Sequence, residues 1–91
     1  MMTVVHVKLS EELQLGGDAA LQRLFEEVSG ADEATLDMSG VGEIDQWLAR
    51  TLVRLARRRG FDRPPIVLIG VNPILRTVLD RTGLDRLFRV T

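Results

Sequence analysis

The sequence has 91 residues, enough for one domain spanning residues 1–91 and too few for two. Its 45% hydrophobic and 27% charged residues are typical of a folded globular protein and argue against a disordered chain. A net charge of -1 gives no overall attraction to nucleic acid or membranes, and the lack of cysteine excludes disulfides, thiol catalysis and cysteine-bound metals. We expect a cytoplasmic protein without membrane insertion, because the sequence shows no signal-like amino terminus and no apolar run of about 18 residues.

The first third of the chain predicts a strand followed by a helix. Residues 4–9 alternate, with Val5, Val7 and Leu9 on one face, which is the period of a strand. Residues 11–15 could add a second short strand before the two glycines that follow them. From residue 18 the apolar positions recur at the spacing of one helix face and end at Ser29 and Gly30; they are Leu21, Leu24, Phe25 and Val28.

A strand and a helix are predicted between residues 34 and 60. Residues 34–38 alternate between apolar and polar side chains, as a short strand does. A helix over residues 46–59 follows, because Asp45 suits the N-cap and Gly60 suits a left-handed stop. Three arginines complement the negative end of its dipole: Arg57, Arg58 and Arg59. Its expected core face consists of Leu48, Ala49, Leu52, Leu55 and Ala56.

The last third predicts a central strand, a helix and a short final strand. Residues 66–69 are apolar without a break, the pattern of a strand covered on both faces. Asn72 suits an N-cap and Pro73 the first helical position, while Gly83 ends the helix. Its expected inward face is Ile74, Leu75, Val78 and Leu79. With a strand or extended tail over residues 87–90, strands and helices alternate, which predicts an α/β fold.

Four segments of the chain resemble, in order, the STAS domain of bacterial anti-sigma-factor antagonists. They are LDMSGV at 36–41, ID at 44–45, IVLIG at 66–70 and LDRTGLDRLF at 79–88. The resemblance implies an α/β fold with a mixed, mostly parallel sheet of 4–5 strands and helices largely on one side. It also implies a non-catalytic function carried by protein-protein contact. Similar proteins bind an anti-sigma factor that is also a serine kinase, and so free the sigma factor.

The chain departs from this family at the residues that follow Asp45. The switch in the family is a serine or threonine just after the matching aspartate, whereas this chain has Gln46, Trp47 and Leu48. Neither an amide nor an indole can accept a phosphoryl group, so the usual phosphorylation site is missing. We therefore expect a constitutive antagonist or scaffold in sigma-factor or stress signalling, with an anti-sigma factor, serine kinase or stressosome-type protein as its partner.

Two alternative functions remain open from the sequence. One is the cytoplasmic STAS subunit of a lipid-transporting ABC complex, which would dock on the ATPase. The other is a small-ligand or nucleotide sensor that uses the loops at the carboxyl ends of the strands. Self-association into a homodimer is also left open.

The expected partner surface covers residues 40–48 and extends along the helix to Arg50 and Arg54. A tryptophan beside arginines is the composition of interface hot spots, and helical geometry turns Trp47 away from the core. The alternative is that the indole folds back onto Val41 and Ile44 of the same loop. The predicted partner-binding residues are Gly42, Glu43, Asp45, Gln46, Trp47, Arg50 and Arg54.

Other candidate sites receive simpler explanations. The three arginines at 57–59 could bind nucleic acid, but a solvated helix end explains them better. Asp37, Glu43 and Asp45 could hold Mg²⁺, but a helix cap and a solvated loop account for them, so no cofactor or metal is expected. His6 is expected to be a structural strand residue. No set of side chains forms a nucleophile, base and oxyanion group, which argues against an enzyme.

Overall fold

The protein is described by a computed structural model that covers residues 2–9 and 17–91. The short strand expected at residues 11–15 lies outside the described residues. Strands and helices alternate along the chain, as the sequence predicts. The elements are β1 (Val4–Lys8), α2 (Gly17–Gly30), β2 (Glu33–Asp37), α3 (Gln46–Arg59), β3 (Ile66–Ile69), α4 (Pro73–Thr82), a 3₁₀ helix η1 (Leu84–Arg86) and β4 (Phe88–Val90).

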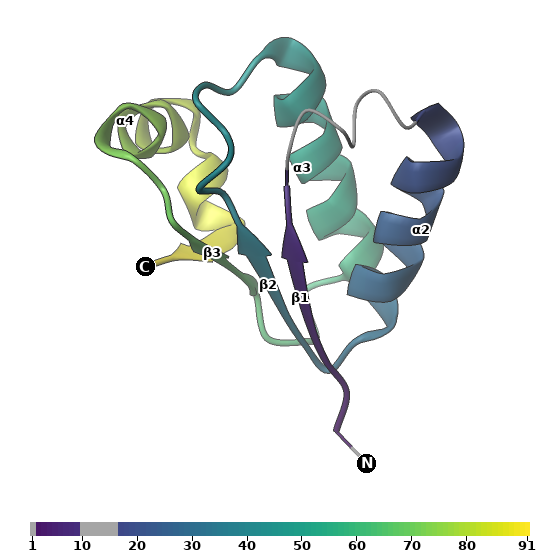
Figure 1. The fold of residues 1–91 in the computed structure, drawn as a ribbon. Helices are drawn as coiled ribbons and strands as arrows, with labels where there is room; N and C mark the ends of the chain where they lie inside the picture. Colours follow the sequence, from purple (N-terminus) through teal and green to yellow (C-terminus); the bar gives the residue numbers. More distant parts are fainter. Residues whose placement is uncertain (1, 10–16) are drawn as a thin grey trace.

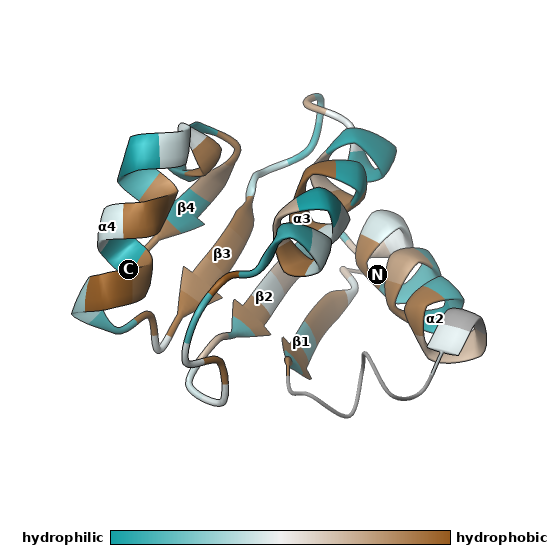
Figure 2. Cartoon of the chain, turned by 90° about the horizontal axis from the view of Figure 1, so that it is seen from above, coloured by the Kyte–Doolittle hydropathy of each residue, from teal (hydrophilic) through white to brown (hydrophobic). Residues whose placement is uncertain are grey.

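The four described strands form one sheet in the order β1-β2-β3-β4, and all neighbouring pairs are parallel. Leu36 lies opposite Val7 on one side and Leu68 on the other. Helices α2 and α3 lie side by side, whereas α4 lies apart from them near β3 and β4 (Figures 1 and 2). This arrangement confirms the expected α/β fold. The expected antiparallel component is not found among the described strands.

The hydrophobic core lies between the sheet and its helices. Alternate strand residues are fully buried, including Leu36 and Leu68, and so are Leu52 and Leu55 of α3. Figure 2 shows β3 as hydrophobic along its length and α3 as a mixture of hydrophobic and hydrophilic segments. The prediction that β3 is covered on both faces is wrong in part, because Val67 and Ile69 are only half-buried. The face of the sheet that carries Leu36 and Leu68 is therefore the more deeply buried one, although Val5 and Val7 of β1 on that face are only half-buried.

The helix ends follow the expected capping residues. The carboxylate of Asp45 accepts the backbone N–H of Leu48 at 2.8 Å, and the side chain of Asn72 accepts that of Leu75 at 2.8 Å. Each bond satisfies an N–H that has no partner within the helix. Gly83 ends α4, as predicted, and it adopts the left-handed conformation. Gly60 also has a positive φ of 87°, but its ψ of 171° is extended, so the expected left-handed stop of α3 is wrong.

The buried faces of α3 and α4 differ from the expected ones at their margins. In α3, Ala49 is only half-buried, while Thr51 and Arg59 are buried among the apolar residues. In α4, the inward position predicted for Ile74 is wrong, since 69% of its surface is exposed. Only Leu75 and Leu79 of this helix are fully buried. Ile74 lies about 100° around the helix from Leu75 and in the first turn, away from that buried pair.

Arg59 has a structural role that its place in an arginine run conceals. Its side chain is 5% exposed, and its guanidinium donates to the carbonyl oxygens of Val28, Ala31 and Asp32 at 2.7 to 2.9 Å. Its Nε also donates to the carbonyl of Pro64 at 3.1 Å. Burial lowers the pKa of Arg59, as does the nearby Arg63, whereas Asp32 raises it. One side chain thus ties the end of α2 to the loop before β3.

Candidate functional site

Loops from three neighbouring strands meet at the carboxyl edge of the sheet. The N–H of Leu9 donates to the carbonyl of Asp37 at 3.0 Å, and that of Met38 donates to Ile69 at 2.8 Å. The side-chain amide of Asn72 reaches the carbonyl of Val41 at 3.5 Å. The end of β2 is therefore bonded to the segment after β1, and the start of the following loop, residues 38–45, is bonded to the segment after β3; this loop rises to the amino end of α3 in Figure 1.

Gly70 allows a close approach between two of these loops. Its φ is +69°, and a Cβ at this position would lie 3.0 Å from the Asp37 carboxylate, from the Cβ of Ser39 and from the backbone N of Ser39. Such contacts are tighter than a Cβ normally makes, so the neighbouring atoms would have to shift, and the positive φ already disfavours a side chain. Glycine at this position thus lets the loop after β3 rest directly on the start of the loop after β2.

Asp37 is held as a carboxylate by the turn that follows β2. Its Oδ1 accepts the backbone N–H of Ser39 at 2.9 Å. This bond lowers the pKa of Asp37 most, followed by the Ser39 side chain, while desolvation opposes them and Lys8 and His6 add smaller favourable effects. The ionised form of Asp37 therefore stabilises the start of the loop.

Asp37→Asn should remove a pH-dependent part of the stability. A carboxyl with a lowered folded pKa stabilises the fold above its unfolded value of 3.8, and this contribution is lost as the pH falls through the folded pKa. The wild type should therefore be more stable than the variant at pH 7, with the gap closing well below pH 3.8. Urea unfolding across this range measures the gap, and Glu43→Gln changes a charge in the same loop as a control. A gap that is constant with pH would contradict the role of the Asp37 charge.

The structure places most of the predicted partner-binding residues on one surface. Gly42, Glu43, Asp45, Gln46 and Arg50 are exposed along the loop and the first turns of α3. We call residues 40–48 with Arg50 and Arg54 the loop surface.

Several members of the loop surface also have contacts inside the molecule. Trp47 is half-buried and packs against the hydrophobic core, as do Val41 and Ile44, so part of the indole serves the fold and part reaches solvent. The guanidinium of Arg54 lies over the ring of Phe25 of α2, 5.4 Å from its centroid. Such a stack contributes about 0.5 to 1 kcal/mol at an exposed site, so Arg54 links α3 to α2 whether or not it binds a partner.

The hydroxyl groups nearest to the start of α3 are Ser39 and Thr51. Thr51 is 4% exposed, and its hydroxyl donates to the carbonyl of Trp47 at 2.8 Å. Ser39 is exposed, but it belongs to the turn that binds Asp37 and precedes the helix cap by six positions. The sequence did not predict that Thr51 is buried. A threonine inside a helix can bond the carbonyl four residues earlier whether the helix position is exposed or buried, so its residue type does not reveal which it is.

The other candidate residues do not gather into a site. Within residues 2–9 and 17–91, no group of three histidine, cysteine or acidic side chains is placed to hold a metal ion, so Asp37, Glu43 and Asp45 do not form one. His6 lies exposed on β1. No helix in the described part of the chain has the length and apolar character needed to cross a membrane.

Comparison with known proteins gives the fold its family. A family model described as "Mlab, STAS domain" matches residues 3–89, nearly the whole chain. The chain belongs to the STAS domain family. Membership supports a general role of this STAS domain in protein interaction, and the family is generally non-enzymatic. No curated protein matches the sequence of this STAS domain.

A solved structure shares the fold of this STAS domain. The NMR structure of the protein TM1081 matches it with a TM-score of 0.75, covering 96% of this chain and 73% of that chain. At 22% sequence identity, the match shows a common fold and does not show a common function. For this STAS domain the loop surface is therefore judged on its own residues.

Proposed function

We propose that this STAS domain is a non-catalytic binding module that is always competent to bind, acting as a constitutive antagonist or scaffold in sigma-factor or stress signalling. One observation carries the proposal: α3 is capped by Asp45 and then begins with Gln46 and Trp47, which offer no hydroxyl. Phosphorylation at this point would add about -1.5 to -2 charges and change what docks on the helix start. Without that acceptor, the loop surface keeps one charge state.

The neighbouring hydroxyls support the absence of a switch at the helix start. Thr51 is buried, and its hydroxyl is already bonded to the carbonyl of Trp47, so a kinase could reach it only after α3 had left the core. Ser39 lies in the turn that holds the Asp37 carboxylate, where an added phosphate would face that negative charge. Neither hydroxyl reproduces the position that the family uses.

The shape of the loop surface suits protein recognition. The start of the loop is held by the bond from the N–H of Met38 to the carbonyl of Ile69 and by that from Asn72 to the carbonyl of Val41, so less ordering entropy is lost in this part when a partner binds. Trp47 presents part of a rigid aromatic side chain beside the exposed Arg50. Aromatic and arginine residues on a rigid surface are the residues that dominate interface energetics. The partner we propose is an anti-sigma factor, a serine kinase or a stressosome-type protein.

A second candidate is a cytoplasmic subunit of an ABC transport complex that docks on the ATPase. The same observation favours it, because a permanently docked subunit needs no phosphorylation switch at Gln46 and Trp47. The two functions differ in the partner that the loop surface retains. A pull-down from the native cell lysate followed by identification of the bound proteins separates them.

Trp47→Ala should weaken binding to the partner by about 2 kcal/mol or more, roughly 30-fold in Kd, if the indole is a hot spot. Arg50→Glu tests the same surface without touching the core, since Arg50 is exposed. Arg76→Glu on α4 is the matched charge control, because Arg76 is also exposed but lies outside the loop surface. Titration of the recovered partner against each variant measures the effect. Unchanged affinity for both Trp47→Ala and Arg50→Glu would exclude the loop surface as the binding site.

The missing switch has its own test. Gln46→Ser places a hydroxyl directly after Asp45, where the family carries its acceptor. If the recovered partner is a serine kinase, it should phosphorylate this variant and then lose affinity for it, while the wild type stays unmodified. Phosphorylation of the wild type itself would overturn the proposal of a constitutive module. Recovery of an ATPase that is indifferent to Gln46→Ser would favour the transport subunit.

A further inference from the structure

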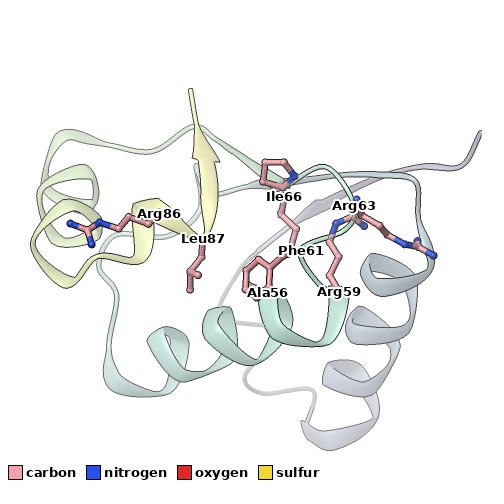
Figure 3. Close-up of a pocket in the computed structure, with 9 residues that line it drawn as sticks. Ala56, Arg59, Phe61, Arg63, Ile66, Arg86 and Leu87 are labelled. Carbon is pink, nitrogen blue, oxygen red and sulfur yellow. The ribbon is translucent and has the colours of Figure 1, made fainter.

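A pocket of about 180 Å³ opens at the carboxyl end of α3, away from the loop surface (Figure 3). Apolar side chains from α3, from the loop before β3 and from the residue before β4 form its walls, among them Ala56, Phe61 and Leu87. Ala56 is buried and Leu87 is half-buried, but Phe61 is 73% exposed. Phe61 thus offers an exposed aromatic surface at the mouth of a pocket whose inner wall is apolar.

The charge around this pocket is one-sided. Its lining includes Arg59, Arg63 and Arg86 and contains no carboxylate. Two carboxylates act nearby, since Asp62 Oδ1 lies close to Gly60 and Asp32 raises the pKa of Arg59, but neither residue lines the pocket, so the lining itself keeps an excess of positive charge. The chain as a whole has a net charge of -1, so this excess is local. A partner with negative charge would be attracted here and not to the molecule in general.

The hydrogen bonds of these arginines argue against a built site for a small anion. Arg59 spends four N–H bonds on the carbonyls of Val28, Ala31, Asp32 and Pro64, out of the five that a guanidinium offers. Arg63 donates to Ala31 at 2.9 Å. In Figure 3 these two side chains lie together on one side of the pocket, while Arg86 lies on the other with its guanidinium directed away. The arginines therefore place positive charge around the pocket, but they do not direct a set of free N–H donors at one small anion.

The volume sets the size of what can enter. An engineered apolar cavity of about 150 Å³ accommodates a benzene molecule, so a pocket of this size holds one leucine or phenylalanine side chain. A flexible segment that offers one such side chain between acidic residues would match both the apolar walls and the positive rim. Nucleic acid fits less well, because Phe61 is the single aromatic residue of the lining and stacking surfaces normally use several.

We propose that this pocket, which we call the basic pocket, binds an acidic segment of a partner protein by taking up one large apolar side chain of that segment. The basic pocket lies at the opposite end of α3 from Gln46 and Trp47. The helix has 14 residues, which at about 1.5 Å per residue separates the two surfaces by roughly 20 Å. This STAS domain can therefore hold two partners at once, and binding at the basic pocket does not depend on the function of the loop surface.

The test is a selection of displayed random 12-residue peptides on immobilised wild-type protein, with counter-selection on the double variant Phe61→Ala, Arg86→Glu. Phe61 and Arg86 are exposed, so the fold should survive both changes. The matched control is Ile74→Ala, Arg76→Glu, which removes another exposed apolar side chain and another exposed arginine on α4. Thermal unfolding of each variant verifies that it is folded.

The expected result is enrichment of acidic peptides that carry a leucine, phenylalanine or tryptophan. The best of them should bind the Phe61→Ala, Arg86→Glu variant at least 10-fold more weakly and the control variant as tightly as the wild type. Amide NMR shifts should cluster at Ala56, Phe61 and Leu87 and spare residues 42–47. Failure to enrich acidic peptides, shifts at the loop surface alone, or pocket-dependent binding of an oligonucleotide or of anionic vesicles in place of the peptides would each overturn the proposal.

Discussion

Replacing Arg59 by alanine is expected to lower the free energy of unfolding by about 3 to 5 kcal/mol, because buried carbonyl groups lose a charged donor. The variant would lose the four hydrogen bonds that Arg59 donates to the carbonyls of Val28, Ala31, Asp32 and Pro64. Of these, Ala31 would keep its bond from Arg63. For a domain of this size, 3 kcal/mol corresponds to a fall in Tm of roughly 15 °C. Thermal and urea unfolding of the variant measure this loss.

The neighbouring arginines provide the controls for Arg59. Arg57→Ala and Arg58→Ala remove the same charge from exposed positions of the same helix turn, and each should cost less than about 1 kcal/mol. Arg58 also lies 5.9 Å from the centre of the Phe25 ring, so its loss should exceed that of Arg57 slightly. Arg59→Lys keeps the charge but not the planar set of donors, and should recover only part of the stability. Equal effects of all three alanine variants would show that the helix dipole, and not the carbonyl network, is what the arginines serve.

Gly70→Ala should lower the free energy of unfolding by about 3 kcal/mol. It should also displace the start of the loop surface. About 1 to 2 kcal/mol comes from placing a side chain at positive φ. The rest comes from the added Cβ, which would lie 3.0 Å from Asp37 and from two atoms of Ser39. Since these atoms begin the loop that leads to α3, a shift there should also change the NMR signals of residues 38–45. Urea unfolding and amide shifts measure the two effects.

Gly83→Ala separates the two causes of that loss. Gly83 has a similar positive φ of 79°, but a Cβ there would meet nothing within 4 Å. It should therefore cost only the conformational part, about 1 to 2 kcal/mol, and leave the signals of residues 38–45 unchanged. If Gly83→Ala destabilises the protein as much as Gly70→Ala does, the close approach of the two loops contributes nothing.

The sequence predicts the bounds of α3 and the start of α4 because their signals are local. Asp45 and Asn72 each bond an N–H three residues ahead, a contact that depends only on the chain around it. The alternation of β2 likewise places Ala34, Leu36 and Met38 in the core, since side chains of a strand alternate between its faces. These contacts need no knowledge of what lies across the fold.

The role of Arg59 could not be predicted in the same way. Arg57, Arg58 and Arg59 look alike in the sequence, and each fits the end of a helix dipole. What distinguishes Arg59 is its contact with the carbonyls of Val28 and Ala31, which lie 31 and 28 residues earlier in the chain. The wrong inward position of Ile74 has the same origin. Which residues at the edge of a helix face are buried depends on how far the neighbouring elements extend, and this is not visible in the sequence around Ile74.

The exposure of the candidate site could be predicted from the sequence, but its contacts with other elements could not. Sequence periodicity correctly turned Arg50 outward and kept Trp47 from full burial. It could not show that Arg54 lies over Phe25 or that Ser39 leaves little room for a side chain at position 70, since both relations join separate elements. The basic pocket is also assembled from two separate stretches of the chain, residues 56–66 and 86–87, and its residues carry no motif. Its only local trace is an unpaired aromatic residue, Phe61, in a loop of charged and proline residues.

The sequential strand order also bears on how the chain emerges during synthesis. Each strand pairs with the next one along the chain, so every loop that must close is short, about 20 to 30 residues, and the sheet can grow from the amino terminus. The contact between Arg59 and Ala31 falls within the same range, since it spans 28 residues. At translation rates of about 5 to 20 residues per second, this arginine is added roughly 1 to 6 seconds later. In a nascent chain that stops before Arg59, the carbonyls of Val28, Ala31 and Asp32 at and after the end of α2 therefore lack this donor.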